Sequence, residues 1–136
     1  MSITLISSIT HISANLATVL FIVVIILQLL LAAGILPISM AWGGKQTVLT
    51  PSLRIASLVS AAILGLFAYV IRQRAGLIGT EDISIAIKIF AWLVTAYMAF
   101  NTFTNLTSQS TAEKKIFTPI TLVLTVACFI VSISKL

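Results

Sequence analysis

Four long apolar runs occupy most of this chain, and only short polar segments separate them. The first run, residues 16–36, is interrupted only by Thr18 and Gln28. A helix of that length extends roughly 30 Å at about 1.5 Å per residue, which matches the hydrocarbon core of a bilayer. Backbone polar groups cannot stay unpaired in lipid, so the runs are expected to be α-helices. The sequence therefore predicts an all-α fold, a transmembrane four-helix bundle that forms one membrane domain over residues 1–136.

The composition supports a membrane environment. Hydrophobic residues make up 60% of the chain and charged residues only 8%. Soluble domains carry about 25% charged residues, so a chain this apolar cannot cover a water-facing surface. The net charge of +5 comes from basic residues that are scattered singly or in pairs. Because they form no basic stripe, nucleic acid is not an expected partner. Their distribution is typical of contacts with lipid headgroups, so the expected partner is the lipid bilayer.

Two Thr-Pro pairs are expected to begin helices. Thr50-Pro51 and Thr118-Pro119 each offer an N-cap threonine and a proline at the first helical position, where the missing N–H costs nothing. The pairs lie half a chain apart, as they would in two tandem hairpins. Together with the apolar runs, they place the spans at residues 14–36, 52–71, 83–106 and 117–134.

The other helix ends carry their own signals. Pro37 is expected to bend or end the first helix. Glu81 and Asp82 are expected to open the third helix, because acids suit the positive end of a helix dipole. The first dozen residues form either a short interfacial helix or an extension of the first span. Cleavage as a signal peptide is disfavoured, since no Lys or Arg precedes the first run and the run is longer than an h-region.

Small and polar residues recur at spacings of three and four within each span, which places them on one face of a helix. In membranes, small residues allow close helix packing and polar residues seek partners on other helices. These faces are therefore expected to point into the bundle. They comprise Thr18, Gln28 and Ala32 on the first helix; Ser57, Ala61, Gly65 and Ala68 on the second; Ser84, Lys88, Ala91, Thr95, Met98, Thr102 and Asn105 on the third; and Thr118, Thr121, Thr125, Cys128 and Ser132 on the fourth.

Two interpretations of these faces compete. In the first, the hydroxyls bond to the backbone or to one another in helix–helix contacts, which is the ordinary arrangement. In the second, some of them line a wet path. Gln28 and Lys88 add weight to the second interpretation, because polar groups inside a membrane are expensive and often functional. Lys88 is close enough to its helix start to extend toward the Glu81 and Asp82 end. Gln28 is more central, so we expect it to bond to another helix or to a second copy of itself.

The intramembrane candidates of this chain are Gln28, Lys88, Thr95, Thr102, Asn105, Thr121 and Thr125. None of the three acids is expected inside a span, whereas proton-coupled transport commonly uses an intramembrane carboxylate. One histidine, His11, and one cysteine, Cys128, provide neither a metal site nor a bis-histidine haem site. We therefore expect no catalytic residues, no cofactor and no metal, and an enzyme is the class that the sequence favours least.

The positive residues do not fix the orientation. Lys45, Arg54, Lys114 and Lys115 flank one side of the membrane, and Arg72, Arg74, Lys88 and Lys135 flank the other. Equal counts give the positive-inside rule no preference. The compact Arg72/Arg74 pair favours termini inside the cell, but a tie also permits insertion in both directions and an antiparallel homodimer.

Several segments resemble a group of small four-span bacterial membrane proteins to which no activity is assigned. The resemblance is carried by Trp42-Gly43-Gly44, by residues 49–57 (LTPSLRIAS), by residues 99–102 (AFNT) and by Phe117-Thr118-Pro119. It covers most of the chain after the first dozen residues. It implies a multi-pass protein of the bacterial cytoplasmic membrane and no particular activity.

The sequence thus predicts a non-catalytic accessory or self-associating membrane bundle. A homo-oligomer or another membrane protein is the expected protein partner. The alternative is a small homo-oligomeric transporter or channel, in which the polar faces of the third and fourth helices line the path. A homo-oligomer would be needed because four short helices alone scarcely enclose a pore.

Overall fold

The computed structural model describes residues 2–79 and 82–134, and within them it contains helices and loops but no strand. The long helices are α1 (Ile3–Ala33), α2 (Pro51–Arg74), α3 (Ile85–Leu106) and α4 (Thr118–Ser132). A π-helical turn, η3 (Glu113–Phe117), leads into α4, and two short 3-10 turns, η1 (Ile38–Met40) and η2 (Trp42–Gly44), follow α1. Four helical segments are long and apolar enough to cross a membrane, the fourth being Glu113–Ser132. The predicted all-α fold with four membrane helices is confirmed.

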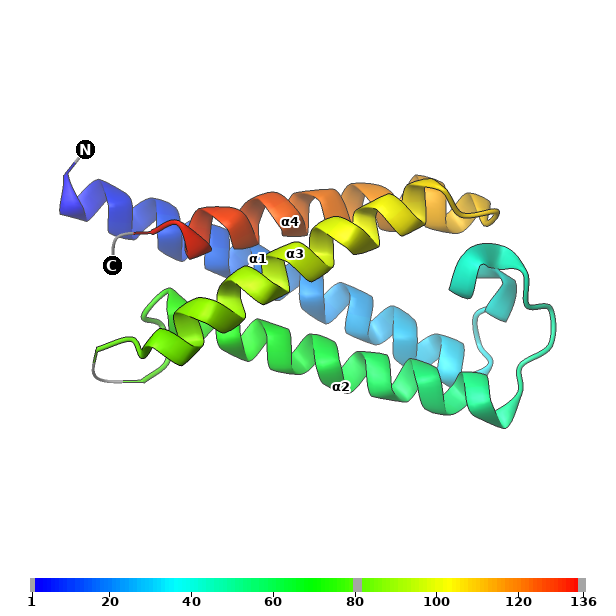
Figure 1. Cartoon of the computed structure of the whole chain (residues 1–136). Helices are drawn as coiled ribbons and strands as arrows, with labels where there is room; N and C mark the ends of the chain where they lie inside the picture. Colours follow the sequence, from blue (N-terminus) through cyan, green and yellow to red (C-terminus); the bar gives the residue numbers. More distant parts are fainter. Residues whose placement is uncertain (1, 80–81, 135–136) are drawn as a thin grey trace.

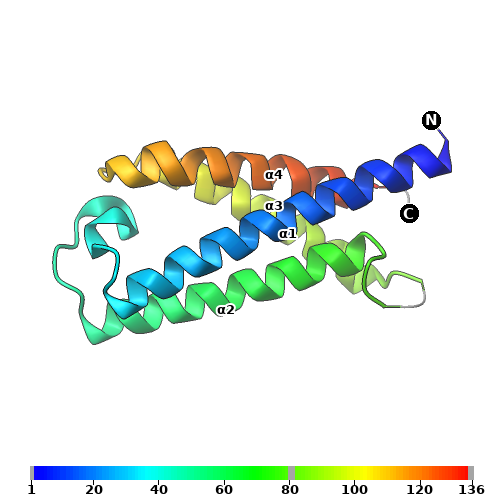
Figure 2. The ribbon, with the colours of Figure 1, turned by 180° about the vertical axis from the view of Figure 1, so that it is seen from behind.

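The helices form two hairpins that cross (Figures 1 and 2). α1 packs mainly against α2 and also against α4, α3 packs mainly against α4, and contact between α2 and α3 is slighter. The two termini and the α2–α3 connection lie at one end of the bundle (Figure 1). Residues 34–50 and 107–113 lie at the other end, which we call the Trp42 end. There α2 and α3 diverge (Figure 1).

α1 is one continuous helix from Ile3, so the N-terminal residues extend the first span instead of forming a separate interfacial helix. Its 31 residues extend about 46 Å, which exceeds the hydrocarbon core of a bilayer. The helix ends at Ala33, because Gly34 adopts a left-handed conformation (φ 81°) and its N–H bonds back to the last turn. The expectation that Pro37 ends the helix is therefore wrong, since the glycine cap comes first.

The two Thr-Pro pairs behave differently. The Thr50 hydroxyl accepts a hydrogen bond from the Leu53 N–H at 3.2 Å, so the predicted N-cap of α2 is confirmed. Thr118 lies inside a continuous helix, and its hydroxyl donates to the Glu113 carbonyl at 3.0 Å. The helix that contains Thr118 begins earlier, with Ser110 as its N-cap. The Ser110 hydroxyl accepts a hydrogen bond from the Glu113 N–H at 3.2 Å. The predicted N-cap role of Thr118 is therefore wrong, because α4 continues η3 without a break.

Pro119 explains the wide turn that precedes it. Proline has no N–H to donate to the carbonyl four residues earlier, and its ring crowds that carbonyl. A π-turn provides the necessary room, and here the Thr118 N–H reaches the Glu113 carbonyl, five residues back. Glu113 is thereby placed at the first residue of the fourth apolar segment.

The third helix begins later than expected. α3 starts at Ile85 with Ser84 as its N-cap, and the Ser84 hydroxyl accepts from the Ile87 N–H at 3.3 Å. Asp82 precedes the helix and is exposed, so it does not open the first turn. Glu81 lies outside the described residues.

The core follows the predicted small-residue faces only in part. On α3, the expectation that Ser84 and Lys88 point inward is wrong, because both are exposed at the start of the helix. On α2, Ser57 and Ala61 are buried, but Leu64 is buried next and Gly65 is exposed. On α1, Thr18 is only half-buried, and the inward face runs through neighbouring apolar positions instead. The fully buried contacts at the centre of the bundle come from Ala14, Ala17 and Phe21 on α1, Ala91 and Met98 on α3, and Leu124, Cys128 and Val131 on α4.

Candidate functional site

The polar faces of α3 and α4 meet each other along the bundle. The three facing pairs are Thr95 with Ser132 (3.1 Å), Thr102 with Thr125 (3.3 Å) and the Asn105 amide with the Thr121 hydroxyl (3.3 Å). The threonine hydroxyls also bond to carbonyls of their own helix, for example Thr125 to the Thr121 carbonyl at 2.7 Å. In the middle pair both threonines have such a carbonyl within reach, so only one can turn its proton toward the other.

These pairs occupy the polar faces that the sequence predicted. Thr95, Asn105 and Thr121 are buried, and Thr102 and Thr125 are half-buried. The outer side of the α3–α4 pair is an apolar groove lined by Trp92, Thr95, Ala96, Ala99, Thr125, Val126 and Phe129. Lys88 is exposed in the first turn of α3 and takes no part in this arrangement. The prediction that Lys88 extends toward Glu81 is not tested, because Glu81 lies outside the described residues.

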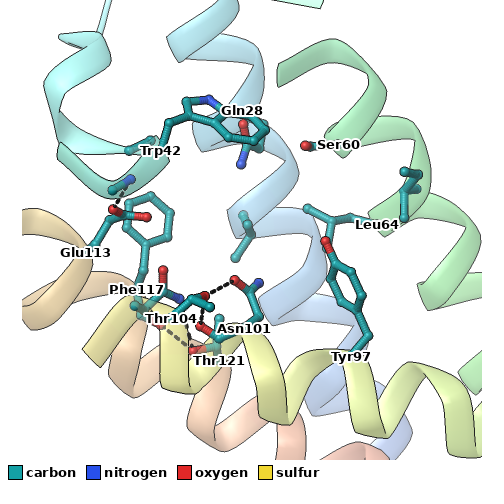
Figure 3. Close-up of a pocket in the computed structure, with 15 residues that line it drawn as sticks. Gln28, Trp42, Ser60, Leu64, Tyr97, Asn101, Thr104, Glu113, Phe117 and Thr121 are labelled. Atoms are coloured by element: carbon teal, nitrogen blue, oxygen red, sulfur yellow. Dashed lines mark hydrogen bonds between the residues drawn. The ribbon is translucent and has the colours of Figure 1, made fainter. Parts of the chain in front are cut away.

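A separate polar cavity of about 320 Å³ lies at the Trp42 end. All four helices and η2 contribute to its wall, and its polar side chains surround a central space (Figure 3). Of the predicted candidates, the cavity brings together Gln28, Asn105 and Thr121. The sequence analysis did not single out its other polar residues, which are Trp42, Ser60, Tyr97, Asn101, Thr104 and Glu113.

Gln28 lies on the inward face of α1, a turn and a half before the helix ends. Its amide oxygen, Oε1, is buried and has no hydrogen-bond partner among the described residues. The expected bond from Gln28 to another helix is therefore not made by this oxygen. An unsatisfied buried acceptor costs about 1–3 kcal/mol, and a donor that reached Gln28 Oε1 would remove this cost.

Glu113 provides the cavity with a carboxylate. Its Oε1 accepts hydrogen bonds from the Gly43 N–H at 2.8 Å and from the Ser108 hydroxyl at 2.5 Å. Ser110 and Glu113 have the spacing of a capping box, in which the glutamate normally returns to the N–H of the cap residue. Here the Ser110 N–H donates to the Ser108 hydroxyl at 2.9 Å instead. The Glu113 side chain is consequently released to bond across to Gly43.

This glutamate is the residue that the sequence analysis missed. The signal was present as Ser110-x-x-Glu113 just before an apolar run. The Thr118-Pro119 pair that follows is an equally good local start signal. The predicted start of the fourth span therefore lies after Glu113. Glu113 is the first residue of the fourth apolar segment, so it lies at a helix start and not inside the span.

The segment that carries Trp42 is fastened on both sides. Trp42 has a positive φ of 55°, which for a residue other than glycine costs about 1–3 kcal/mol. Its indole N–H donates to the Ser57 hydroxyl on α2 at 3.3 Å. On the other side, the Gln109 N–H donates to the Gly43 carbonyl at 3.2 Å and the Ser110 hydroxyl donates to the Met40 carbonyl at 2.9 Å. These contacts hold the indole at the rim of the cavity.

The cavity combines one carboxylate with uncharged polar and aromatic side chains. Among the described residues that line it, Glu113 is the only charged side chain. Within residues 2–79 and 82–134, no group of three or more His, Cys, Asp or Glu residues is placed to hold a metal ion. Lys45, Lys114 and Lys115 are exposed at the same end of the bundle but do not line the cavity.

No family model matches the chain, and neither a curated protein nor a solved structure matches it. These comparisons therefore identify no family for the chain, and they do not test the resemblance to small four-span bacterial membrane proteins. What holds is that the chain has four helices long and apolar enough to span a membrane.

Proposed function

We propose that this protein is a non-catalytic accessory or self-associating bundle of the bacterial cytoplasmic membrane. It would act by associating with itself or with another membrane protein. The observation that carries the proposal is the pairing of the polar faces of α3 and α4. In the alternative, a small transporter or channel, these same faces would have to meet water.

The hydrogen bonds along the α3–α4 interface support the proposal. Thr95, Asn105 and Thr121 are buried, and each makes a hydrogen bond across the interface to a residue of the other helix. The groove on the outer side of the two helices is apolar, as expected for a surface that faces lipid. Along this outer groove, the described residues do not form the continuous polar lining that a path for ions or polar solutes requires.

Cysteine accessibility in intact membranes tests the proposal. With Cys128→Ala as background, Thr95→Cys and Thr125→Cys would each be challenged with a small, charged, membrane-impermeant thiol reagent. Gln46→Cys, in the exposed loop between α1 and α2, serves as the positive control. We expect rapid labelling at Gln46→Cys from one side of the membrane and none at Thr95→Cys or Thr125→Cys.

Rapid labelling at Thr95→Cys or Thr125→Cys would overturn the proposal in favour of transport. Labelling at two further positions, Lys88 and Gln28, would not distinguish the two functions. Lys88→Cys is exposed near a helix start, so its labelling is neutral between the functions. Gln28→Cys lines the cavity at the Trp42 end, so labelling there shows only that this cavity opens to water.

A further inference from the structure

The cavity at the Trp42 end has a charge opposite to that of the chain. The protein has a formal net charge of +5, but among the described residues Glu113 is the only charged side chain that lines the cavity. A single carboxylate in a confined, partly apolar space attracts a cation and repels an anion.

Two residues of the cavity, Gln28 and Glu113, have free acceptor oxygens, although the lining also includes side chains that can donate, such as Tyr97 and Asn101. Gln28 Oε1 is buried without a hydrogen-bond partner. Glu113 Oε1 already accepts from Gly43 and Ser108, whereas the second carboxylate oxygen accepts no hydrogen bond from a described residue. A ligand that pairs with both residues donates at least two hydrogen bonds, and the Glu113 carboxylate favours a ligand that also carries positive charge. A primary ammonium group meets both requirements, since it has three donors and no acceptor.

Aromatic side chains complete the site. Trp42 and Phe117 lie beside Glu113, and Tyr97 lies on the opposite side of the central space (Figure 3). Because the indole N–H of Trp42 is already bonded to Ser57, the ring contributes its apolar surface and its π-face. Aromatic faces attract ammonium groups and pack well against the methylenes next to them.

Other cations fit this lining less well. Calcium and magnesium take six or more oxygen ligands, which suits a site with several carboxylates better than a site with one. A quaternary ammonium has no N–H, so it would leave Gln28 Oε1 unsatisfied. The lining therefore selects an organic cation that can donate hydrogen bonds.

We propose that this cavity binds a primary ammonium group, with Glu113 as its counter-ion and Gln28 Oε1 as a second acceptor. Two sources carry this chemistry, a small free amine and the ethanolamine headgroup of a phospholipid. The lipid source suits the place of the cavity, because α2 and α3, which both line it, diverge at the Trp42 end (Figure 1) and the lysines of that end are exposed and suit a phosphate. The inference does not depend on the accessory role proposed above.

The protein contains a built-in reporter for the test. It has two tryptophans, Trp42 in the cavity wall and Trp92 outside it. The Trp92→Phe variant leaves Trp42 as the sole tryptophan of the full chain. Its fluorescence would be titrated in phosphatidylcholine vesicles with free ethanolamine, with tetramethylammonium and with sodium chloride. A parallel series would compare vesicles with and without phosphatidylethanolamine.

We expect a saturable change of Trp42 fluorescence with ethanolamine or with phosphatidylethanolamine, and a weaker change with tetramethylammonium. Glu113→Gln should weaken binding at least about tenfold, because it removes the charge while its amide oxygen still accepts from Gly43 and Ser108. Gln28→Leu should also weaken it, and it leaves the loop contacts of Glu113 untouched. Asp82→Asn, which removes an exposed acid at the opposite end, is the matched control and should bind like the parent.

A response to free ethanolamine supports the proposal with a free amine as ligand. A response to phosphatidylethanolamine alone supports it with the lipid headgroup as ligand. The proposal is overturned if neither produces a saturable change, if sodium chloride reproduces the change, or if both Glu113→Gln and Gln28→Leu bind as the parent does.

Discussion

The Glu113 carboxylate accepts a hydrogen bond from the backbone N–H of Gly43 at 2.8 Å, although 70 residues separate the two along the chain. This bond joins the connection after α1 to the turn that leads into α4. It also fixes the carboxylate at the wall of the polar cavity, next to Trp42 (Figure 3). The Trp42-Gly43-Gly44 segment and Glu113 therefore form one structural unit at the Trp42 end.

The first prediction concerns the close approach of Gly44 to the turn before η3. A Cβ at Gly44 would lie 2.5 Å from the Ser110 nitrogen, so an alanine there must push the two segments apart. Gly44→Ala should lower the free energy of unfolding by about 1–3 kcal/mol more than Gly76→Ala, as overpacking does. The measurement is unfolding by denaturing detergent in mixed micelles, followed by circular dichroism.

Gly76 is the matched control for that comparison. Its φ of +79° is close to the +77° of Gly44, but nothing lies within 4 Å of a Cβ placed there. Both variants carry the same strain of a left-handed alanine, so the difference between them isolates the collision with Ser110. Equal losses in the two variants would contradict the close packing of Gly44.

The second prediction concerns the Asn105–Thr121 pair between α3 and α4. A double-mutant cycle with Asn105→Ala and Thr121→Val should give a coupling of about 0.6 kcal/mol and no more than about 2 kcal/mol, the range found between membrane helices. Unfolding of the four proteins in mixed micelles provides the cycle. A coupling of zero would show that the 3.3 Å contact contributes no net stability.

The third prediction compares the two arginines at the end of α2. Arg74 is only 3% exposed, and its guanidinium donates to the Ser134 carbonyl at 2.5 Å. Arg72 is half-buried and donates to the Asn15 amide oxygen and the Thr18 hydroxyl at 2.9 and 3.2 Å.

Arg74→Gln should therefore cost about 1.5–3 kcal/mol, the usual range for a buried charged hydrogen bond. Arg72→Gln should cost about 1 kcal/mol or less, because water or headgroups can replace its contacts. Thermal unfolding in detergent distinguishes the two variants. A larger loss for Arg72→Gln would reverse the assignment of the buried arginine.

Residues on one helix face were predictable from spacing alone. Thr95 and Asn105 on α3 and Thr121 on α4 each belong to a series of small and polar residues at intervals of three and four, and such residues lie on the same side of an α-helix. Once lipid is the surrounding solvent, that side must face other helices. Their inward position was therefore determined before any tertiary contact was known.

The helix starts were less predictable, because equal local signals compete. Thr50-Pro51 begins a helix since the residues before it form an irregular loop. Thr118-Pro119 has the same local pattern, but Ser110 caps the helix eight residues earlier, and a π-turn accommodates the proline. The choice between the two starts depended on the contacts of residues 108–113 with Gly43 and Met40, which a local pattern does not contain.

The sequence by itself determined the solvent, the four apolar helices and the inward polar faces of α3 and α4, because these follow from composition and from the helical period. Only the tertiary structure decided the cavity at the Trp42 end. Gln28, Trp42, Asn101 and Glu113 come from segments with no fixed spacing between them, and the crossing of the two hairpins brings them together. Side-chain periodicity acts within one helix, whereas a binding site requires the relative placement of several, and packing alone sets that placement.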